Sequence, residues 1–158
     1  QALRNTDDRV KNDQSVTPGF LLAALLWPTL ISRCTKNNEI NIRKFFRSMD
    51  GVLREQQKLT AVPRKFNSYI KDIWVLQLKL HSRIKSQPYK TIRHPRFRAA
   101  YDFLLVREKA SSDKNGLGKW WTDFQKNDDS LRGSLIARMN EKNDADSSKI
   151  FGFYNELR

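Results

Sequence analysis

Apolar residues recur at helical spacing along most of this chain, and alternating, strand-like patterns are few. One face of the segment 42–53 would carry Ile42, Phe45, Phe46, Met49, Val52 and Leu53. The segment 94–108 repeats this pattern with Phe97, Ala100, Tyr101, Leu104 and Leu105. Spacings of three and four residues place such side chains on one side of an α-helix. The sequence therefore predicts an all-α fold, an irregular helical bundle of about six to eight helices with no sheet.

Prolines mark several of the expected helix boundaries. Thr17-Pro18 predicts a helix start, because a threonine hydroxyl caps free backbone N–H groups and proline suits the first turn. His94-Pro95 and Pro63 predict two further starts by the same reasoning. The segment 18–33 is apolar on nearly all sides, which is typical of a helix at the centre of a bundle. Pro28 is expected to kink or divide it.

The remaining segments are shorter or more polar. A helix is expected over residues 2–13, a loop over 35–39, a connector with one helical turn over 85–93, and a short helix over 117–127. After Asp128 the helical pattern fades. We therefore expect a helical body domain at 1–127 and a C-terminal tail at 128–158. The tail is expected to be partly mobile and to end in a short helix near 150–157.

Length and composition limit the class of protein. A chain of 158 residues with 39% hydrophobic residues is long enough for one domain with a buried core. The single cysteine, Cys34, excludes an internal disulfide and is expected to be a free structural thiol, as in a reducing compartment. No apolar run reaches the ~18 residues of a membrane span, and no secretory signal is visible. The sequence thus predicts a cytoplasmic chain without membrane association. Because it lacks an initiating methionine, we expect a piece of a longer protein.

Positive charge is concentrated in one part of the chain. The formal net charge is +13, and residues 36–98 hold sixteen Lys/Arg but only four Asp/Glu. A surface of one sign favours an anionic partner, and nucleic acid fits best, with an acidic protein or an anionic membrane as alternatives. The candidate binding residues are Arg43, Lys44, Arg47, Lys85, Lys90, Arg93, Arg96 and Arg98. The simpler interpretation is a solvated helix surface, with Arg98 and Asp102 paired at i, i+4.

Catalytic chemistry finds little support in the sequence. His81 and His94 lack metal-ligand spacing and are interpreted as surface or capping groups. Asp144-Ala145-Asp146 has the form that holds Mg²⁺ in nucleotidyl transfer, but it lies in a polar tail. Trp120-Trp121 could stack on bases, yet adjacent helical residues point in different directions, so at least one is expected in the core. We predict no catalytic residue and no metal site in this chain.

Four motifs carry a resemblance to a known family. "VTPGFLLAALLW" (16–27), "IKDIWVLQLKL" (70–80), "HPRFRAAYDFLLVRE" (94–108) and "LGKWWTDFQ" (117–125) are similar, in this order and spacing, to the C-terminal part of bacterial poly(A) polymerase. This class II nucleotidyltransferase family is related to the CCA-adding tRNA enzymes. The tail departs from the family pattern, because members often end in a strongly basic segment and residues 140–149 are not one.

The resemblance implies a helical region that guides single-stranded RNA 3′ ends to a catalytic domain. That N-terminal domain, with its ATP and Mg²⁺, would lie outside this chain and be its partner. The fragment would then bind RNA without being an enzyme by itself and hold no cofactor. Two alternatives stay open: a basic protein-interaction module that docks an acidic partner, and the equivalent region of a CCA-adding enzyme. Leu3 and Val10 would leave an apolar patch, from which we expect a homodimer of the fragment.

Overall fold

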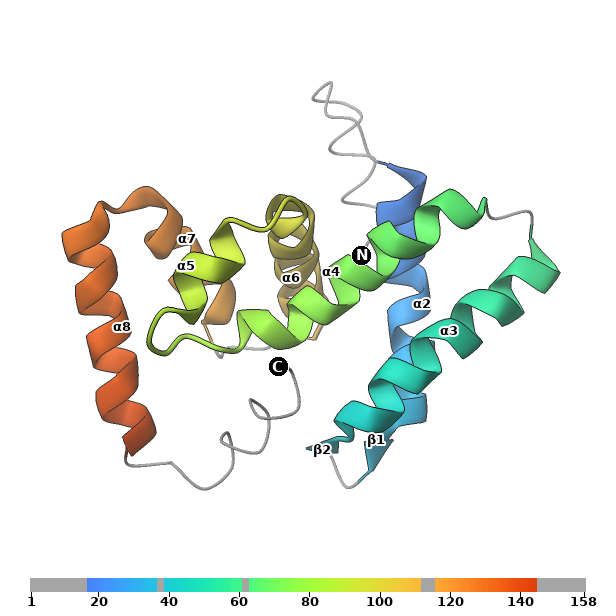
Figure 1. Ribbon diagram of the computed structural model, residues 1–158, viewed down its shortest axis with the longest axis horizontal. Helices are drawn as coiled ribbons and strands as arrows, with labels where there is room; N and C mark the ends of the chain where they lie inside the picture. The colour runs from blue at the N-terminus through green and yellow to red at the C-terminus, as the bar shows by residue number, and fades with distance from the viewer. Residues whose placement is uncertain (1–16, 37–38, 61–62, 112–115, 145–158) are drawn as a thin grey trace. The chain divides into compact units, whose positions relative to one another are not determined.

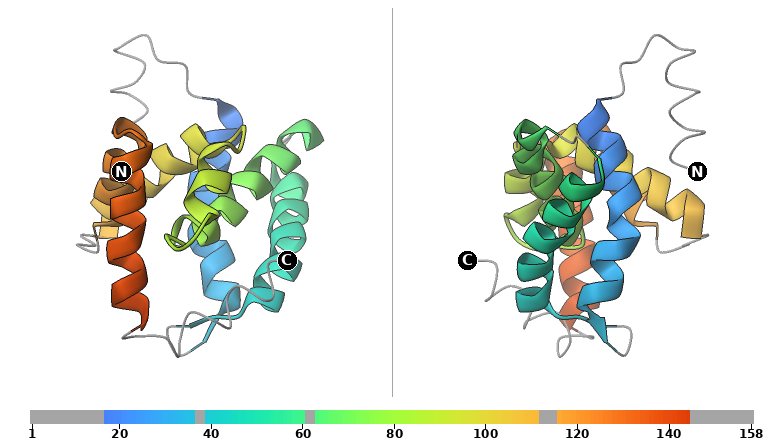
Figure 2. Two further views of the ribbon diagram at one scale, coloured as in Figure 1. Left: turned by 60° about the vertical axis from the view of Figure 1, so that its left-hand side comes forward. Right: turned by 90° about the vertical axis from the view of Figure 1, so that its right-hand side faces the viewer.

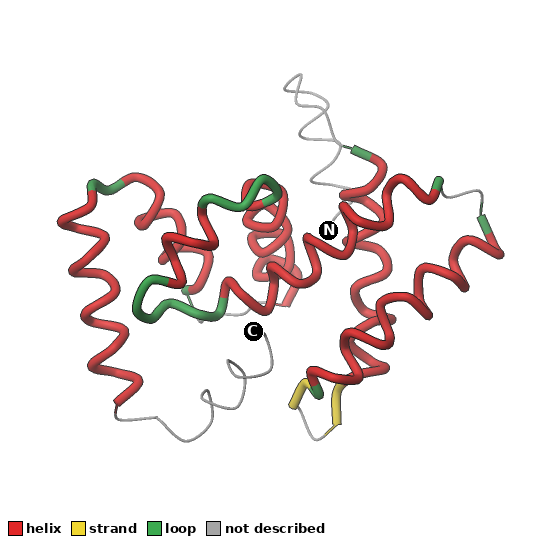
Figure 3. Tube along the Cα trace, viewed as in Figure 1, coloured by secondary structure: helices red, strands yellow, loops and turns green. Residues whose placement is uncertain are grey.

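The computed structural model describes residues 17–36, 39–60, 63–111 and 116–144, and they are almost entirely helical (Figures 1 and 3). The chain divides into two compact units, residues 1–75 and 76–158, with the division inside one helix. The α-helices are α2 (Pro18–Cys34), α3 (Ile42–Leu59), α4 (Asn67–Leu80), α5 (Gln87–Ile92), α6 (Phe97–Ser111), α7 (Leu117–Lys126) and α8 (Asp129–Asp144). A short 3₁₀ helix, η1 (Arg64–Phe66), precedes α4. The predicted all-α class and number of helices are confirmed.

A hairpin of two short strands, each two residues long, is the exception to the predicted absence of a sheet. Strands β1 (Thr35–Lys36) and β2 (Glu39–Ile40) pair antiparallel, with Thr35 opposite Ile40. The backbone N–H of Asn41 then donates to the carbonyl of Cys34 (2.9 Å). The expectation of a plain loop at 35–39 was therefore wrong, because the chain must reverse between two helices that pack together and does so through ladder hydrogen bonds.

Helix α2 begins where the sequence predicted. The Thr17 hydroxyl accepts a hydrogen bond from the backbone N–H of Phe20 (3.3 Å), and Pro18 occupies the first turn. The helix is not divided at Pro28 and continues to Cys34. The expected position at the centre of a bundle was also wrong, since Leu25 is 54% exposed. One face alone is buried, through Ala23, Trp27 and Leu30 among others.

That buried face packs against α3 in the first unit (Figure 2). The α3 stripe was predicted correctly: Ile42, Phe45, Met49, Val52 and Leu53 are buried, while Phe46 is half-buried. Phe45 meets the ring of Trp27 edge-on at 6.1 Å between centroids. The part of α4 in this unit contributes Trp74, whose indole N–H donates to the carbonyl of Ala23 (2.9 Å).

Cys34 closes the same core as a free thiol, as expected. Its Sγ lies 3.1 Å from the carbonyl oxygen of Leu30, and the residue is 1% exposed. Burial raises the pKa of the Cys34 thiol, because the thiolate would lose its hydration there.

Two proline-marked starts are shifted from their expected positions. Pro63 caps η1, and α4 begins at Asn67. Helix α6 begins at Phe97, after a turn in which the backbone N–H of Arg96 donates to Nδ1 of His94 (3.1 Å). His94 is therefore a capping group, which is one of the two roles that the sequence suggested for it. The connector at 85–93 contains the short helix α5.

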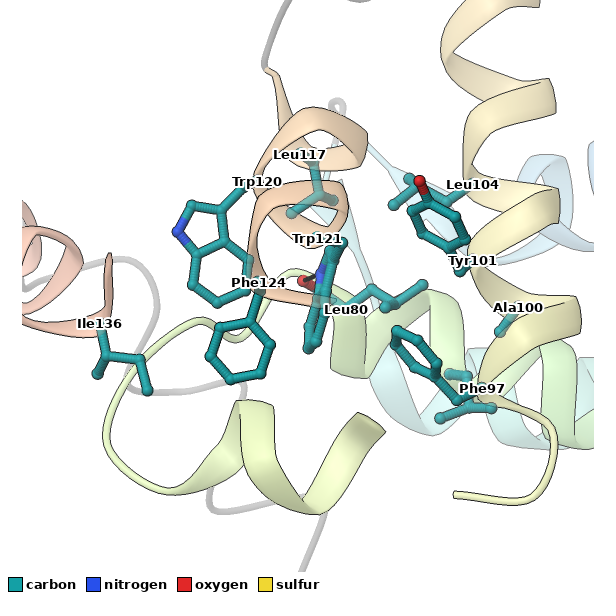
Figure 4. Close-up of a cluster of buried hydrophobic side chains, with 11 residues drawn as sticks. Leu80, Phe97, Ala100, Tyr101, Leu104, Leu117, Trp120, Trp121, Phe124 and Ile136 are labelled. Atoms are coloured by element: carbon teal, nitrogen blue, oxygen red, sulfur yellow. Dashed lines mark hydrogen bonds between the residues drawn. The ribbon is translucent and has the colours of Figure 1, made fainter. Parts of the chain in front are cut away.

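The second unit is built around an aromatic core between α6 and α7 (Figure 4). Trp121 and Phe124 are fully buried, and the Trp121 indole N–H donates to the carbonyl of Leu80 (2.8 Å). The predicted stripe of α6 is buried except for Leu105, which is partly buried. Phe103 and Val106 are buried as well, so this helix covers more of the core than one stripe suggests.

Helix α8 was not predicted. It occupies residues 129–144, where the helical pattern faded, and Ile136 joins the aromatic core with 7% exposure. Arg132 fixes the start of α8 through a hydrogen bond from Nε to the Phe124 carbonyl (2.8 Å). The helices expected near 2–13 and 150–157, and the patch at Leu3 and Val10, lie outside the described residues.

Candidate nucleic-acid interface

Three of the predicted binding residues project from the first half of α3. Arg43, Lys44 and Arg47 are all exposed, on the sides of the helix that face away from α2. Asn41 caps this helix by accepting from the backbone N–H of Lys44 (2.9 Å). The cations are exposed because the apolar residues at 42, 45, 49, 52 and 53 take the buried side.

Both acidic residues of α3 are engaged within the first unit. Lys71 of α4 forms an ion pair with Asp50, and Arg33 of α2 holds Glu55 through two hydrogen bonds, one of 3.0 Å. The hydrogen bond from Arg33 lowers the pKa of Glu55, because it favours the ionised carboxylate. The neighbouring Arg54 is exposed and has no acidic partner among the described residues. The sequence did not single out Arg54. The nearby acids Asp50 and Glu55 are paired with cations of other helices, and the sequence does not show such contacts.

The other five predicted residues lie together in the second unit, from the turn before α5 to the start of α6. Lys85, Lys90, Arg93, Arg96 and Arg98 are all exposed. Lys85 has a left-handed backbone (φ 51°) in the turn that leads into α5. Arg93 follows the last residue of α5 as its C-cap. The short helix α5, the turns on either side of it and the first turn of α6 thus present five cations over fourteen residues.

Arg98 is partly engaged by its own helix. Its guanidinium Nε lies 3.2 Å from a carboxylate oxygen of Asp102, and it also lies over the ring of Tyr101 at 5.7 Å. The predicted i, i+4 pair is therefore confirmed. The side chain of Arg98 is nevertheless 74% exposed, so the guanidinium can reach a further anion.

Other arginines of the second unit serve the fold. Arg107 donates from Nη1 to the buried Oε1 of Gln77 (2.9 Å), and Arg132 bonds to carbonyls at the end of α7. The sequence alone did not separate these arginines from exposed ones.

The tryptophan pair is not an exposed stacking platform. Trp120 and Trp121 are both buried, at 8% and 0% exposure, and they meet edge-on with their centroids 5.0 Å apart. The expectation that at least one is in the core is confirmed, and base stacking on either ring finds no support.

The described residues offer no ligand set for a metal ion. No group of three or more His, Cys, Asp or Glu side chains comes together in the part of the chain that the structure describes. The Asp144–Asp146 motif lies outside it, apart from the backbone of Asp144. None of the described helices is long and apolar enough to cross a membrane.

Comparison with known proteins agrees with these features. The family model described as "Polymerase A arginine-rich C-terminus" matches residues 37–150, and the chain belongs to this family. Poly(A) polymerase I of Escherichia coli O157:H7 is 37% identical over 131 residues, which cover 79% of this chain. Poly(A) polymerase I of Salmonella typhi is 34% identical over the same share of this chain. That of Haemophilus influenzae is 34% identical over 140 residues, or 85% of this chain.

The matched region is a minor part of each relative. It makes up 28% of the Escherichia coli and Salmonella proteins and 31% of the Haemophilus protein. The resemblance that the four motifs suggested is thereby confirmed.

Proposed function

We propose that this chain is the RNA-holding region of a bacterial poly(A) polymerase. It would bind single-stranded RNA near the 3′ end and present that end to a catalytic domain of the same protein. The observation that carries the proposal is the cation excess of residues 36–98, together with the exposure of all eight predicted binding residues. Family membership supports the same function.

The arrangement of charge suits backbone phosphates. Phosphate contacts position a strand without reading its bases, so they need exposed cations at several places and no deep pocket. On α3 the acids that would repel a phosphate are already paired with Lys71 and Arg33. The five exposed cations from Lys85 to Arg98 lie on α5, its flanking turns and the first turn of α6. Each group can neutralise phosphates within its own unit.

The chemistry of the whole protein would lie elsewhere. We propose that the catalytic domain uses ATP and Mg²⁺ and that this chain alone transfers no adenylate. The names of the relatives, Poly(A) polymerase I, favour poly(A) addition over CCA addition. Such a protein would work in the cytoplasm, where its RNA is found.

The test is fluorescence anisotropy with a labelled single-stranded RNA at several salt concentrations. Affinity should fall by about 0.7 log units per log unit of salt for each phosphate neutralised, so four contacts give a slope near −3. Absence of binding at low salt would contradict the proposal. Equal competition by polyglutamate and by RNA of matched charge would favour the acidic-protein alternative instead.

A further inference from the structure

Three partly buried arginines of the second unit each lie over an aromatic ring. Arg107 lies 6.0 Å from the ring centroid of Phe103, and Arg132 lies 5.4 Å from that of Phe124. Both also donate hydrogen bonds to protein acceptors, namely Gln77 Oε1 and the Phe124 carbonyl. These contacts satisfy N–H groups that burial removes from water.

The third arginine, Arg83, lacks such acceptors. It lies in the turn after α4, with its guanidinium 5.9 Å from the ring centroid of Trp120. No carboxylate or carbonyl among the described residues accepts a hydrogen bond from it. Burial lowers the pKa of Arg83, because part of its charge has lost hydration without a compensating anion. A guanidinium in this situation favours any anion that can reach it.

Two further polar atoms are also without partners, one on Trp120 and the other on Ser82, the residue that precedes Arg83 in the chain. The Ser82 hydroxyl and the Trp120 indole N–H are buried, both residues being 8% exposed, and neither makes a hydrogen bond. In Figure 4 the indole nitrogen of Trp120 lies on the side of the ring away from Trp121 and Tyr101. An unsatisfied buried donor costs about 1–3 kcal/mol, so a ligand that accepts from it recovers stability. Residues 81–86 contain no acid that could take this role.

We propose that Arg83, Ser82 and Trp120 form a recessed site for a phosphate group. A phosphate supplies the negative charge that Arg83 lacks and several acceptor oxygens for the hydroxyl and the indole N–H. Because the two orphaned atoms are buried, the side chains around them must shift to admit the ligand.

The phosphate can come from an RNA backbone or from a free phosphate compound. The first source rests on the proposed function, and the second does not. An RNA phosphate held here would be desolvated and weakly screened by salt, unlike phosphates on exposed lysines. Arg83 would then anchor the strand that the exposed residues from Lys85 to Arg98 attract.

The experiment compares Arg83→Gln and Ser82→Ala with the wild-type chain. RNA affinity should fall about tenfold in Arg83→Gln, which loses a charge-assisted contact, and about threefold in Ser82→Ala. Arg138→Gln is the matched control, because it removes the same charge from an exposed position on α8 and should change affinity little. Thermal melting confirms that each variant is folded.

A second measurement separates the two sources and does not depend on RNA. Inorganic phosphate, at the ionic strength of a chloride control, should raise the melting temperature of the wild-type chain but not of Arg83→Gln. Such an effect with unchanged RNA affinity, or with no RNA binding at all, supports the site with a free phosphate compound as its ligand. Wild-type RNA affinity and a wild-type phosphate effect in folded Arg83→Gln would overturn the proposal.

Discussion

At the scale of single residues, Gln77 shows how the second unit accommodates a buried polar group. The residue is 1% exposed, and its amide Nε2 donates to the carbonyl of Ala100 (2.9 Å). Its Oε1 accepts from Nη1 of Arg107 (2.9 Å). One side chain thus links a carbonyl of α6 to an arginine of the same helix, and removing it would lose both hydrogen bonds.

We expect Gln77→Leu to lower the free energy of unfolding by about 2 kcal/mol, in spite of its similar volume, because the hydrogen bonds to Ala100 and Arg107 are lost. Gln56→Leu is the control, since the Gln56 side chain donates to the exposed hydroxyl of Thr60. Denaturant unfolding of both variants measures the difference. Equal stability of the two would show that the buried contacts contribute nothing.

Gly118 gives a second test at this scale. A Cβ at this position would lie 2.6 Å from Cδ2 of Leu105 and would meet the Glu108 carboxylate, which accepts from the backbone N–H of Gly118 (2.9 Å). We expect Gly118→Ala to destabilise the chain by about 1–3 kcal/mol through this overpacking. Gly133, in α8, has no atom within 4 Å of such a Cβ.

Gly133→Ala should therefore have the opposite sign, a stabilisation of about 0.5–1 kcal/mol from helix propensity. Thermal melting of the two variants checks both. A stabilising Gly118→Ala would mean that α6 and α7 approach less closely than the structure describes.

At the scale of elements, the sequence predicted best where one side of a helix differs sharply from the other. The stripe of α3 and the cap at Thr17 were readable because both depend on local residues alone. Helix α8 was missed, since its apolar residues Leu131, Leu135, Ile136 and Met139 stand among many polar ones. The start of α6 was placed too early because the turn at His94 also suits a proline.

The docking of α8 can be tested with two apolar residues of that helix. Ile136 is 7% exposed in the aromatic core, whereas Leu131 is 51% exposed. We expect Ile136→Ala to cost about 2–4 kcal/mol and Leu131→Ala less than about 1 kcal/mol, because truncation matters where it leaves a cavity. Chemical denaturation of both variants gives the comparison. A small loss of stability in Ile136→Ala would contradict the packing of α8 against the aromatic core.

At the scale of the whole molecule, the site was only partly predictable. Exposure of Arg43, Lys44, Arg47 and Arg98 followed from the apolar stripes of α3 and α6, which fix the opposite sides of these helices. The pairing of Asp50 and Glu55 with cations of other helices could not be predicted, because ion pairs between elements depend on packing. Arg83 was missed for the same reason, since its burial against Trp120 has no local signal.

The exposed cations from Lys85 to Arg98 should determine how RNA affinity depends on salt concentration. We expect Arg93→Glu with Arg96→Glu to flatten the slope of log affinity against log salt by at least one unit, because two phosphate contacts are lost. Lys126→Glu with Arg138→Glu changes net charge equally at exposed positions on α7 and α8 and should alter the slope less. Anisotropy measures both, with melting curves to confirm folding. Identical slopes would leave Arg93 and Arg96 as solvated helix charges.

The burial of Cys34 also provides a way to measure how often the core of the first unit opens. The sequence contains one thiol, and it lies in the core of the first unit. A reagent such as a disulfide dye can reach it only when that core opens, so the labelling rate counts opening events there. Because the thiol pKa is raised, labelling should stay slow at neutral pH and quicken in denaturant. The labelling rate of this one native cysteine would thus measure how often the core opens, without an engineered cysteine.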